Sequence, residues 1–250
     1  MPHSIFLLNR LIVMLKIYPV LCRAGTMDNY AYILQDGATG ISAVLDPSEP
    51  QPIIQKLDEL GLEPQYILNT HHHFDHTDGN LELKQRYKAQ VVANANDASR
   101  IPGFDIGVAP GSTFMLGQSP AEIIDVSAHT QGHILWYFPQ DKALFTGDTL
   151  FNLCVGGLFE GTAEQMYHAL AKIKQLPDDV DFYPGHEYTL GGADFANYVN
   201  NGNSNMSEYL RHASEKLRAG LPVCPVKLGI EKKCNPYLQA DSLEQLKKLL

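Results

Sequence analysis

The sequence has no cysteine pair spaced as Cys-x-x-Cys, although it contains four cysteines. Cys22, Cys154, Cys224 and Cys234 are widely spaced, which excludes a zinc knuckle built from thiolates. Cysteines used in this way are typical of proteins from a reducing compartment. We therefore expect a cytoplasmic protein.

Long hydrophobic runs and an excess of positive charge are also missing. The apolar stretches 5–8 and 11–15 are separated by Asn9 and Arg10. Both stretches are much shorter than the roughly 18–20 residues that a membrane-spanning helix requires. The formal net charge is −9, whereas a surface that binds nucleic acid is usually basic. We therefore expect neither a membrane nor a nucleic acid as a partner.

The remaining composition is that of an ordinary globular protein. Hydrophobic residues make up 44% of the chain and charged residues 19%, which is typical of this class. The length of 250 residues allows one sizeable core, or one large domain with a small appendage. We expect residues 1–13 to be a non-essential extension, because Met14-Leu15-Lys16-Ile17-Tyr18 makes a natural start to a first strand.

Short apolar runs and helical patterns recur along the chain and predict a mixed α/β (α+β) class. We expect loop at 97–112 and no strands after residue 188. A change of composition near residue 182 predicts a catalytic domain over 14–182 and a mainly helical domain over 183–250. The expected strands are 16–21, 30–34, 41–45, 66–68, 90–93, 122–126, 134–138, 142–145 and 181–183. The expected helices follow Asp46-Pro47-Ser48, cover 81–88, follow the capping-box pattern Thr162-Ala163-Glu164-Gln165, and begin near Asp241.

The segment Thr70-His71-His72-His73-Phe74-Asp75-His76 directly follows the expected strand 66–68 and is too short for a helix. So many imidazoles would repel one another if protonated and would gain little packing if neutral. Neutral imidazoles and a carboxylate that converge on a divalent metal remove this conflict. In an extended segment His71, His73 and Asp75 project together, and a bend at Asp75 would let Asp75 and His76 face a second ion. The alternative is a histidine-rich surface loop.

Three further residues of metal-ligand type follow other expected strands. His129 follows 122–126, Asp148 follows 142–145, and His186 follows 181–183. A single histidine or aspartate after a strand is usually structural, so each position alone is a weak signal. Together with the first loop, however, they place ligand types at four strand ends, where α/β proteins carry their chemistry. We expect His72 and His133 to pack against or orient such ligands rather than bind a metal.

The first loop resembles the His-x-His-x-Asp-His signature of the metallo-β-lactamase superfamily, and the three later positions match in order. The resemblance implies a four-layer αβ/βα sandwich with a C-terminal helical domain. It further implies that His71, His73 and His129 bind one divalent metal, that Asp75, His76 and His186 bind a second, and that Asp148 bridges the two. We expect Zn²⁺, although iron and manganese suit the same ligands.

Several stretches resemble the glyoxalase II (hydroxyacylglutathione hydrolase) family within this superfamily. In that family a tyrosine and basic residues hold the glutathione moiety, and Tyr188 and Lys232 match such positions. The sequence departs from the family pattern at Gly157, where a lysine or arginine is usual, and at Gln239, where an arginine often follows. The matching stretches are Thr70 to Asn80, Phe145 to Phe151, Phe159 to Thr162, Gly185 to Thr189, and Glu231 to Leu238.

The resemblance implies a monomeric hydrolase of methylglyoxal detoxification, which converts S-(2-hydroxyacyl)glutathione, typically S-D-lactoylglutathione, to D-lactate and glutathione. Asp148 would hold both metals, and Asp75 would hold one metal and orient the attacking hydroxide, so both act through metal-bound hydroxide. Alternatives are a hydrolase of another thioester or a lactone, and a mononuclear iron persulfide dioxygenase, which should lack a full second ligand set. The acidic charge disfavours a nuclease, and a non-catalytic metal protein would not need two open sites.

Overall fold

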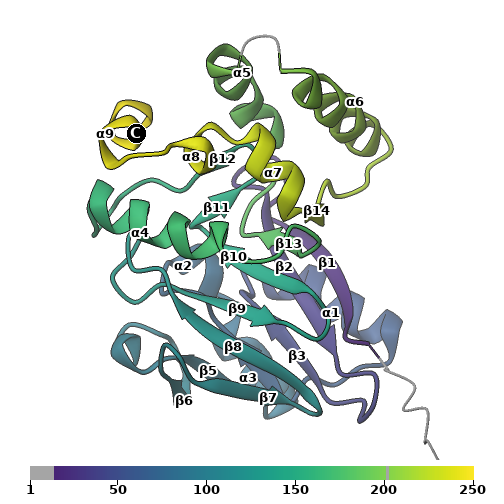
Figure 1. Cartoon of the computed structure of the whole chain (residues 1–250). Helices are drawn as coiled ribbons and strands as arrows, with labels where there is room; N and C mark the ends of the chain where they lie inside the picture. The colour runs from purple at the N-terminus through teal and green to yellow at the C-terminus, as the bar shows by residue number, and fades with distance from the viewer. Residues whose placement is uncertain (1–13, 201–202) are drawn as a thin grey trace, which may run out of the picture.

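The computed structural model describes residues 14–200 and 203–250, so the predicted extension 1–13 lies outside the described residues. The chain forms two six-stranded sheets with helices on their outer faces, and a group of helices from the C-terminal part lies at one end (Figure 1). In the described part of the chain, no helix combines the length and the apolar character that crossing a membrane would require.

The first sheet is antiparallel at its beginning and parallel from β3 onward. Parallel neighbours need a crossover connection. Helix α1 (Pro50–Leu60) supplies it between β3 and β4, and α3 (Asn80–Tyr87) supplies it between β4 and β5. Across the sheet the strands are β1 (Lys16–Cys22), β2 (Asn29–Gln35), β3 (Ser42–Leu45), β4 (Tyr66–Leu68), β5 (Gln90–Asn94) and β6 (Phe104–Val108).

The second sheet is antiparallel except where β10 pairs in parallel with β13, after the crossover helix α4 (Ala163–Lys174). Strands β8, β10 and β13 therefore run in the same direction and end at the same edge. Across the sheet the strands are β14 (Val226–Lys227), β13 (Asp181–Pro184), β10 (Ala143–Gly147), β9 (Ile134–Phe138), β8 (Ser119–Asp125) and β7 (Thr113–Leu116).

The remaining elements lie at one end of the second sheet. A short hairpin of β11 (Leu150–Phe151) and β12 (Cys154–Val155) follows β10, and the C-terminal helices pack beside it (Figure 1). These helices are α5 (Thr189–Val199), α6 (Ser204–Arg218), α7 (Leu228–Cys234), α8 (Pro236–Gln239) and α9 (Leu243–Leu249).

Three hydrophobic cores separate four layers. The central core holds Tyr32 of the first sheet and Trp136 of the second, so the two sheets pack face to face. Leu57 of α1 belongs to a second core on the outer face of the first sheet. Leu170 of α4 and Leu246 of α9 belong to a third core on the outer face of the second sheet. The predicted four-layer sandwich with helical C-terminal elements is thereby confirmed.

Local sequence signals explain the end of one crossover helix and the start of another, both of which were predicted. Helix α1 buries Ile53 and Leu57 at helical spacing and ends at Gly61, whose φ of 64° is left-handed. Helix α4 begins at a complete capping box. The Thr162 side chain accepts a hydrogen bond from the Gln165 backbone N–H, and the Gln165 side chain accepts one from the Thr162 backbone N–H.

Two predictions about secondary structure are wrong, and strands were missed. Residues 97–112, expected to be loop, contain the edge strand β6, in which only Val108 is fully buried, so its apolar pattern is weak. Strand β7 was also missed. A strand does follow residue 188, because β14 adds two residues to the edge of β13. Residue 182, the predicted domain boundary, lies inside β13, and the division into two domains stays a prediction.

Trp136 connects the central core to the loop that follows β4. The indole is fully buried, and its Nε1–H donates to Asn69 O at 3.1 Å. Replacing Trp136 by Phe removes this hydrogen bond, leaves a buried carbonyl without a donor and opens a cavity. We expect the free energy of unfolding to fall by about 2–4 kcal/mol. Urea unfolding followed by far-UV circular dichroism measures it, because Trp136 is the only tryptophan and cannot report on its own replacement.

Candidate metal centre

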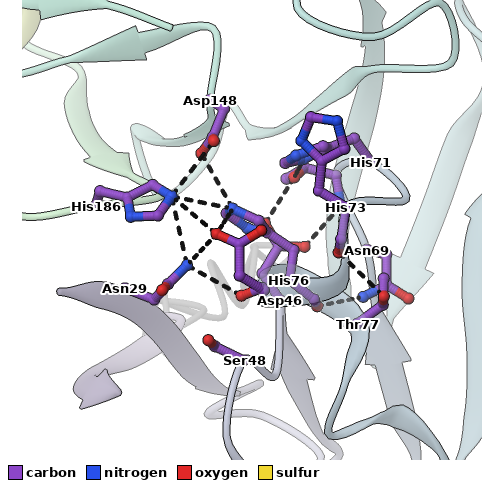
Figure 2. A network of polar contacts seen from close by, with 12 residues as sticks. Asn29, Asp46, Ser48, Asn69, His71, His73, His76, Thr77, Asp148 and His186 are labelled. Atoms are coloured by element: carbon purple, nitrogen blue, oxygen red, sulfur yellow. Dashed lines mark hydrogen bonds and ion pairs between the residues drawn. The ribbon is translucent and has the colours of Figure 1, made fainter. Parts of the chain in front are cut away.

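Four loops bring the seven predicted metal ligands together. His71, His73, Asp75 and His76 follow β4, whereas His129, Asp148 and His186 follow β8, β10 and β13. Figure 2 shows Asp148 and His186 facing the residues of the first loop. The loops meet because β8, β10 and β13 end at the same edge of one sheet, and β4 ends opposite them in the other.

The ligand atoms form two groups, and within each group they lie within 4.8 Å of one another. One group joins His71, His73, His129 and Asp148, and the other joins Asp75, His76 and His186. Asp46 forms a further group of this kind with His71 and His76. The family resemblance implied the first two sets with Asp148 shared between them, and metal binding by these residues stays a prediction.

Asp148 lies between the two groups. Its Oδ2 is 3.5 Å from Nε2 of His129 in the first group and 3.3 Å from Nε2 of His186 in the second. Its Oδ1 is 3.2 Å from Nε2 of His76. A single carboxylate therefore faces ligands of both groups, as a bridging ligand must.

The nitrogen positions fit divalent cations. His129 Nε2 lies 3.0 Å from His73 Nδ1, and His76 Nε2 lies 3.3 Å from His186 Nε2. A cation placed between such nitrogens would accept the lone pairs of both rings when the rings are neutral. Within the described residues, His71 Nε2 is also buried without a hydrogen-bond partner, which is costly unless a ligand satisfies it.

Backbone carbonyls fix the tautomers of two ligands. His129 Nδ1–H donates to Gly157 O at 2.7 Å, and His186 Nδ1–H donates to Met27 O at 2.8 Å. Because a carbonyl only accepts, the proton of each neutral ring lies on Nδ1. Nε2 therefore presents its lone pair to the centre, as is usual for metal-bound histidines.

Asp46 supports the centre and was not predicted to belong to it. Its Oδ1 accepts from Thr70 N at 2.7 Å, and its Oδ2 accepts from Thr70 Oγ1 at 2.6 Å. The same Oδ2 lies 3.1 Å from His76 Nδ1 and so directs His76 Nε2 inward (Figure 2). The sequence carried a signal, because Asp46 directly follows the buried strand β3, but Asp46-Pro47-Ser48 was interpreted only as a helix start.

Asn29 and His133 also support ligands. Asn29 Nδ2 donates to the backbone oxygen of Asp75 at 3.0 Å and to its Oδ2 at 2.9 Å. His133 Nε2 accepts from Asp148 N at 3.1 Å, and its ring stacks on His71 at a centroid distance of 4.7 Å. His133 therefore orients ligands, as predicted, whereas Asn29 gave no recognisable signal because it lies at the start of an ordinary strand.

The first loop is not extended as far as Asp75, contrary to our expectation. A helical turn, α2 (Phe74–Thr77), begins one residue earlier. His76 N donates to His73 O at 3.0 Å, and Thr77 Oγ1 donates to the same oxygen at 3.0 Å. This turn rotates Asp75 and His76 away from the residues before it, so one loop supplies ligands to both groups.

Two glycines leave room for this arrangement. Gly147 precedes Asp148 and has a φ of 46°, in the left-handed region that favours glycine. A Cβ atom on Gly185 would collide with Asp148 Oδ1 and with His76 Cε1. The backbone therefore approaches the bridging carboxylate more closely than any other residue type would permit.

Histidines of the first group are neutral at pH 7. Burial lowers the pKa of His71 well below its ordinary value. Burial, with the neighbouring His129, lowers the pKa of His73 to about 4. Burial likewise lowers the pKa of His129. These rings are ready to bind a cation without first losing a proton.

The second group is more strongly coupled to charge. Burial opposes protonation of His186, but the Asp148 carboxylate outweighs it and raises the pKa of His186 to about 9. The same balance raises the pKa of His76 well above its ordinary value. Burial would raise the pKa of Asp75, yet hydrogen bonding from His186 and the charge of His76 lower it.

A cavity of 400 Å³ opens onto the centre. Its polar wall includes Asp75 and Asp148, and its apolar wall includes Phe151 and Phe159. Tyr188 also lines it and stacks on the His186 ring, with centroids 4.6 Å apart.

Lys232 and His72 have other partners. Lys232 Nζ donates to Leu176 O and to Asp178 Oδ1, each at 2.7 Å, and its role in substrate binding stays a prediction. His72 lies 3.5 Å from Asp97 Oδ2 and 3.6 Å from Glu160 Oε1. It therefore faces away from both ligand groups.

The chain is similar to known families along nearly its whole described length. Residues 24–186 match the metallo-beta-lactamase superfamily. Residues 187–249 match the C-terminus of hydroxyacylglutathione hydrolases.

Two relatives named hydroxyacylglutathione hydrolase are similar over most of their length. The protein of Pelagibacter ubique is 42% identical over 222 residues, which cover 89% of this chain and 93% of the relative. The protein of Methylococcus capsulatus is 42% identical over 217 residues, which cover 87% of this chain and 85% of the relative.

Solved structures share the fold at low identity. A metallo-beta-lactamase from Staphylococcus aureus has a TM-score of 0.72 and 19% identity, over 95% of this chain and 67% of that chain. ETHE1 from Myxococcus xanthus has a TM-score of 0.70 and 24% identity, over 92% of this chain and 88% of that chain. Both comparisons bear on the fold alone.

Metal binding should release protons at neutral pH. Asp148 raises the pKa values of His76 and His186, so this pair retains protons at neutral pH that a bound cation must displace. We expect affinity for Zn²⁺ to increase from pH 6 to pH 8, with proton release that diminishes above about pH 9. Titration calorimetry in buffers of different ionisation enthalpy measures the release.

Asp148→Asn is the matched control, because it keeps the shape of the side chain but removes the charge that raises the pKa values of His76 and His186. It should release fewer protons for each bound ion. Binding of Zn²⁺ by the parent protein without proton release at pH 7 would contradict this account.

Proposed function

The chain belongs to the metallo-beta-lactamase superfamily and, within it, to the hydroxyacylglutathione hydrolases, and we propose that its two ligand groups hydrolyse a glutathione thioester. The substrate is S-(2-hydroxyacyl)glutathione, and S-D-lactoylglutathione gives D-lactate and glutathione. The observation that carries the proposal is Asp148, which faces both groups at the floor of the cavity. In this function the protein contributes to methylglyoxal detoxification.

Divalent metal ions fit the site, and we propose Zn²⁺ for both positions. His71, His73 and His129 would hold one ion, Asp75, His76 and His186 the other, and Asp148 both. When bound, two such cations supply Lewis acidity and lower the pKa of water from 15.7 towards about 7, so that hydroxide forms at neutral pH. Nitrogen and carboxylate donors suit zinc, and iron and manganese remain the alternatives.

Two carboxylates orient the attacking water. Asp75 and Asp148 both line the cavity, and their pKa values are lowered despite burial, by His186 and His76 for Asp75 and by His76 and His186 for Asp148. Both therefore remain ionised and accept hydrogen bonds from a water molecule at the thioester carbonyl. Asn29 Nδ2 donates to Asp75 Oδ2, which leaves Oδ1 of Asp75 for this task.

Aromatic side chains form much of the remaining wall of the cavity. Phe74 and Phe159 are largely exposed, whereas Phe151 is buried. The hydroxyl of Tyr188 stays protonated, because burial raises its pKa to about 12. It can therefore donate a hydrogen bond to the thiol half of the substrate.

The departing thiol requires little assistance. A thiol has an ordinary pKa of about 8.5, so a thiolate is a good leaving group without a general acid. Electrostatic stabilisation of the developing oxyanion is then the main task of the site.

The second ligand group argues against the mononuclear alternative. A mononuclear iron persulfide dioxygenase should lack a full second ligand set. The chain places Asp75, His76 and His186 within 4.8 Å of one another, which favours the binuclear hydrolase. A hydrolase of a different thioester or of a lactone shares the chemistry and is separated from our proposal only by substrate.

We also propose that the protein is a cytoplasmic monomer. The four cysteines lie within the described residues and are free thiols, which suits a reducing compartment. Size-exclusion chromatography with light scattering tests the monomer directly.

Removing a ligand from the first group or the bridge should abolish hydrolysis. We expect His73→Ala and Asp148→Ala to lower kcat/KM for S-D-lactoylglutathione by about a thousandfold or more, because each removes transition-state stabilisation. Loss of the thioester absorbance measures the rate. His72→Ala is the matched control from the same loop, because His72 faces Asp97 and Glu160 instead of the metals, and it should keep the parent rate within about threefold.

A D-lactoyl thioester of another thiol and a lactone complete this experiment. Hydrolysis of the lactone at the same rate as the thioesters would contradict thioester specificity. Full activity of His73→Ala and Asp148→Ala would contradict the binuclear mechanism.

A further inference from the structure

Residues 129–132, which we call the His129 turn, are hydrogen-bonded to a second segment of the chain. The backbone N–H groups of Phe159 and Glu160 donate to His129 O at 3.2 and 3.3 Å. The side chain of Glu160 also contacts the turn, because its Oε2 accepts from Gln131 N at 2.7 Å. Gln131 Nε2 donates to Glu160 O at 2.9 Å in return. Glu160 therefore fixes the backbone at His129 and again two residues beyond it.

A buried carboxylate holds the other end of the His129 turn. Asp97 ends the short 3₁₀-helix Ala95–Asp97, which follows β5, and it is buried. Gly132 packs directly on this carboxylate, because a Cβ atom on Gly132 would collide with Asp97 Cγ. Asn94 Nδ2 donates to Gly132 O at 3.0 Å. The turn therefore has Glu160 at its start and Asp97 at its end.

Arg100 joins these two carboxylates. Its Nε donates to Asp97 Oδ1 at 3.0 Å, its Nη2 donates to the same oxygen, and its Nη1 donates to Glu160 Oε1 at 2.5 Å. The planar guanidinium holds its donors in a rigid fork, so it fixes the separation of its two partners as a flexible ammonium group cannot. We call Asp97, Arg100 and Glu160 the Arg100 clamp.

The clamp is held together by charge and is closed without His72. Burial would raise the pKa of Glu160, but hydrogen bonds from Gln131 N and from Arg100 lower it, so Glu160 remains ionised at neutral pH. A buried carboxylate such as Asp97 is unfavourable without a cation, and Arg100 supplies that cation. His72 lies 3.4 to 3.6 Å from members of the clamp, which is longer than the hydrogen bonds within it.

The clamp acts on one ligand group and not on the other. His129 belongs to the first group, and its ring is fixed by Gly157 O, which lies in the same segment as Glu160. In the described part of the chain, no member of the clamp forms a hydrogen bond or an ion pair with a ligand of the second group. Opening the clamp should therefore disturb the first group selectively.

We propose that Arg100 is a positioning residue that aligns His129 with the first ligand group, by keeping the clamp closed around the His129 turn. Arg100 does not line the metal-facing cavity, so it acts through His129 and not on the substrate. The inference rests on the metal binding proposed above and does not depend on which ester or thioester is hydrolysed. Replacing a residue that supports a metal ligand typically lowers metal affinity 10- to 100-fold.

Arg100→Met tests the proposal in two backgrounds that each retain one complete ligand group. His186→Ala keeps the first group, and His73→Ala keeps the second. Calorimetric titration of the metal-free protein with Zn²⁺ then measures the affinity of each group separately. We expect Arg100→Met to weaken Zn²⁺ binding by about tenfold in the His186→Ala background, because His129 is no longer aligned, and by less than about twofold in the His73→Ala background.

Two further substitutions act as control and cross-check. Arg86→Met is the matched control, because Arg86 also pairs with an acid, Asp58 at 3.7 Å, but lies on the exposed side of α3. It should leave the affinity for Zn²⁺ unchanged in both backgrounds. Glu160→Gln opens the same clamp from its other end and should weaken the first group by a similar factor. Combined with Arg100→Met it should add little further loss, because the two side chains act as one unit, and losses that multiply would contradict a shared clamp.

Thermal unfolding of the metal-free protein verifies that each variant is folded. If Arg100→Met does not fold, Arg100→Lys takes its place, because lysine keeps the charge without the fork, and a loss of about threefold is then expected for the first group alone. Equal losses in both backgrounds, or no loss in the His186→Ala background, would overturn the proposal. If no thioester is hydrolysed, the proposed function fails, and the two affinities still decide whether Arg100 positions His129.

Discussion

The buried carboxylate of Asp148 is the group on which the rest of the site depends. It lies 3.2 to 3.5 Å from imidazole nitrogens of both ligand groups. Its charge raises the pKa of His186, and its backbone N–H donates to His133. Gly185 has no side chain that could displace the Asp148 carboxylate. A negative charge placed so deeply is unfavourable without cations, so the fold around Asp148 is arranged for metals.

Residues of the C-terminal helices also support the metal centre, through the β11–β12 hairpin. Glu231 of α7 accepts from Leu153 N, and Asn235 Nδ2 donates to Cys154 O at 3.1 Å. These contacts hold the β11–β12 hairpin, which leads directly to Gly157, whose carbonyl fixes His129. Glu231 and Asn235 therefore help to fix a metal ligand through the hairpin and Gly157.

The sequence alone was enough to predict the features that depend on short-range residue patterns. The ligand types at four strand ends, and the helix that ends at Gly61, follow from local residue order. Asn29 was missed because its role arises only when β2 and the first loop meet in space. Asp46 was missed because Asp46-Pro47-Ser48 also fits the start of a helix, although its position at the end of β3 was a signal. The strands β6 and β14 were missed because they are edge strands, and pairing with a neighbour, more than burial of their own side chains, determines them.

We propose that the two ligand groups act together as a binuclear centre. Titration of the metal-free protein with Zn²⁺, while hydrolysis of S-D-lactoylglutathione is followed, tests this proposal. We expect activity to remain low after the first equivalent and to reach its maximum at about two equivalents, because Asp148 must hold both ions. Full activity at one equivalent, with no change on adding the second, would contradict the account.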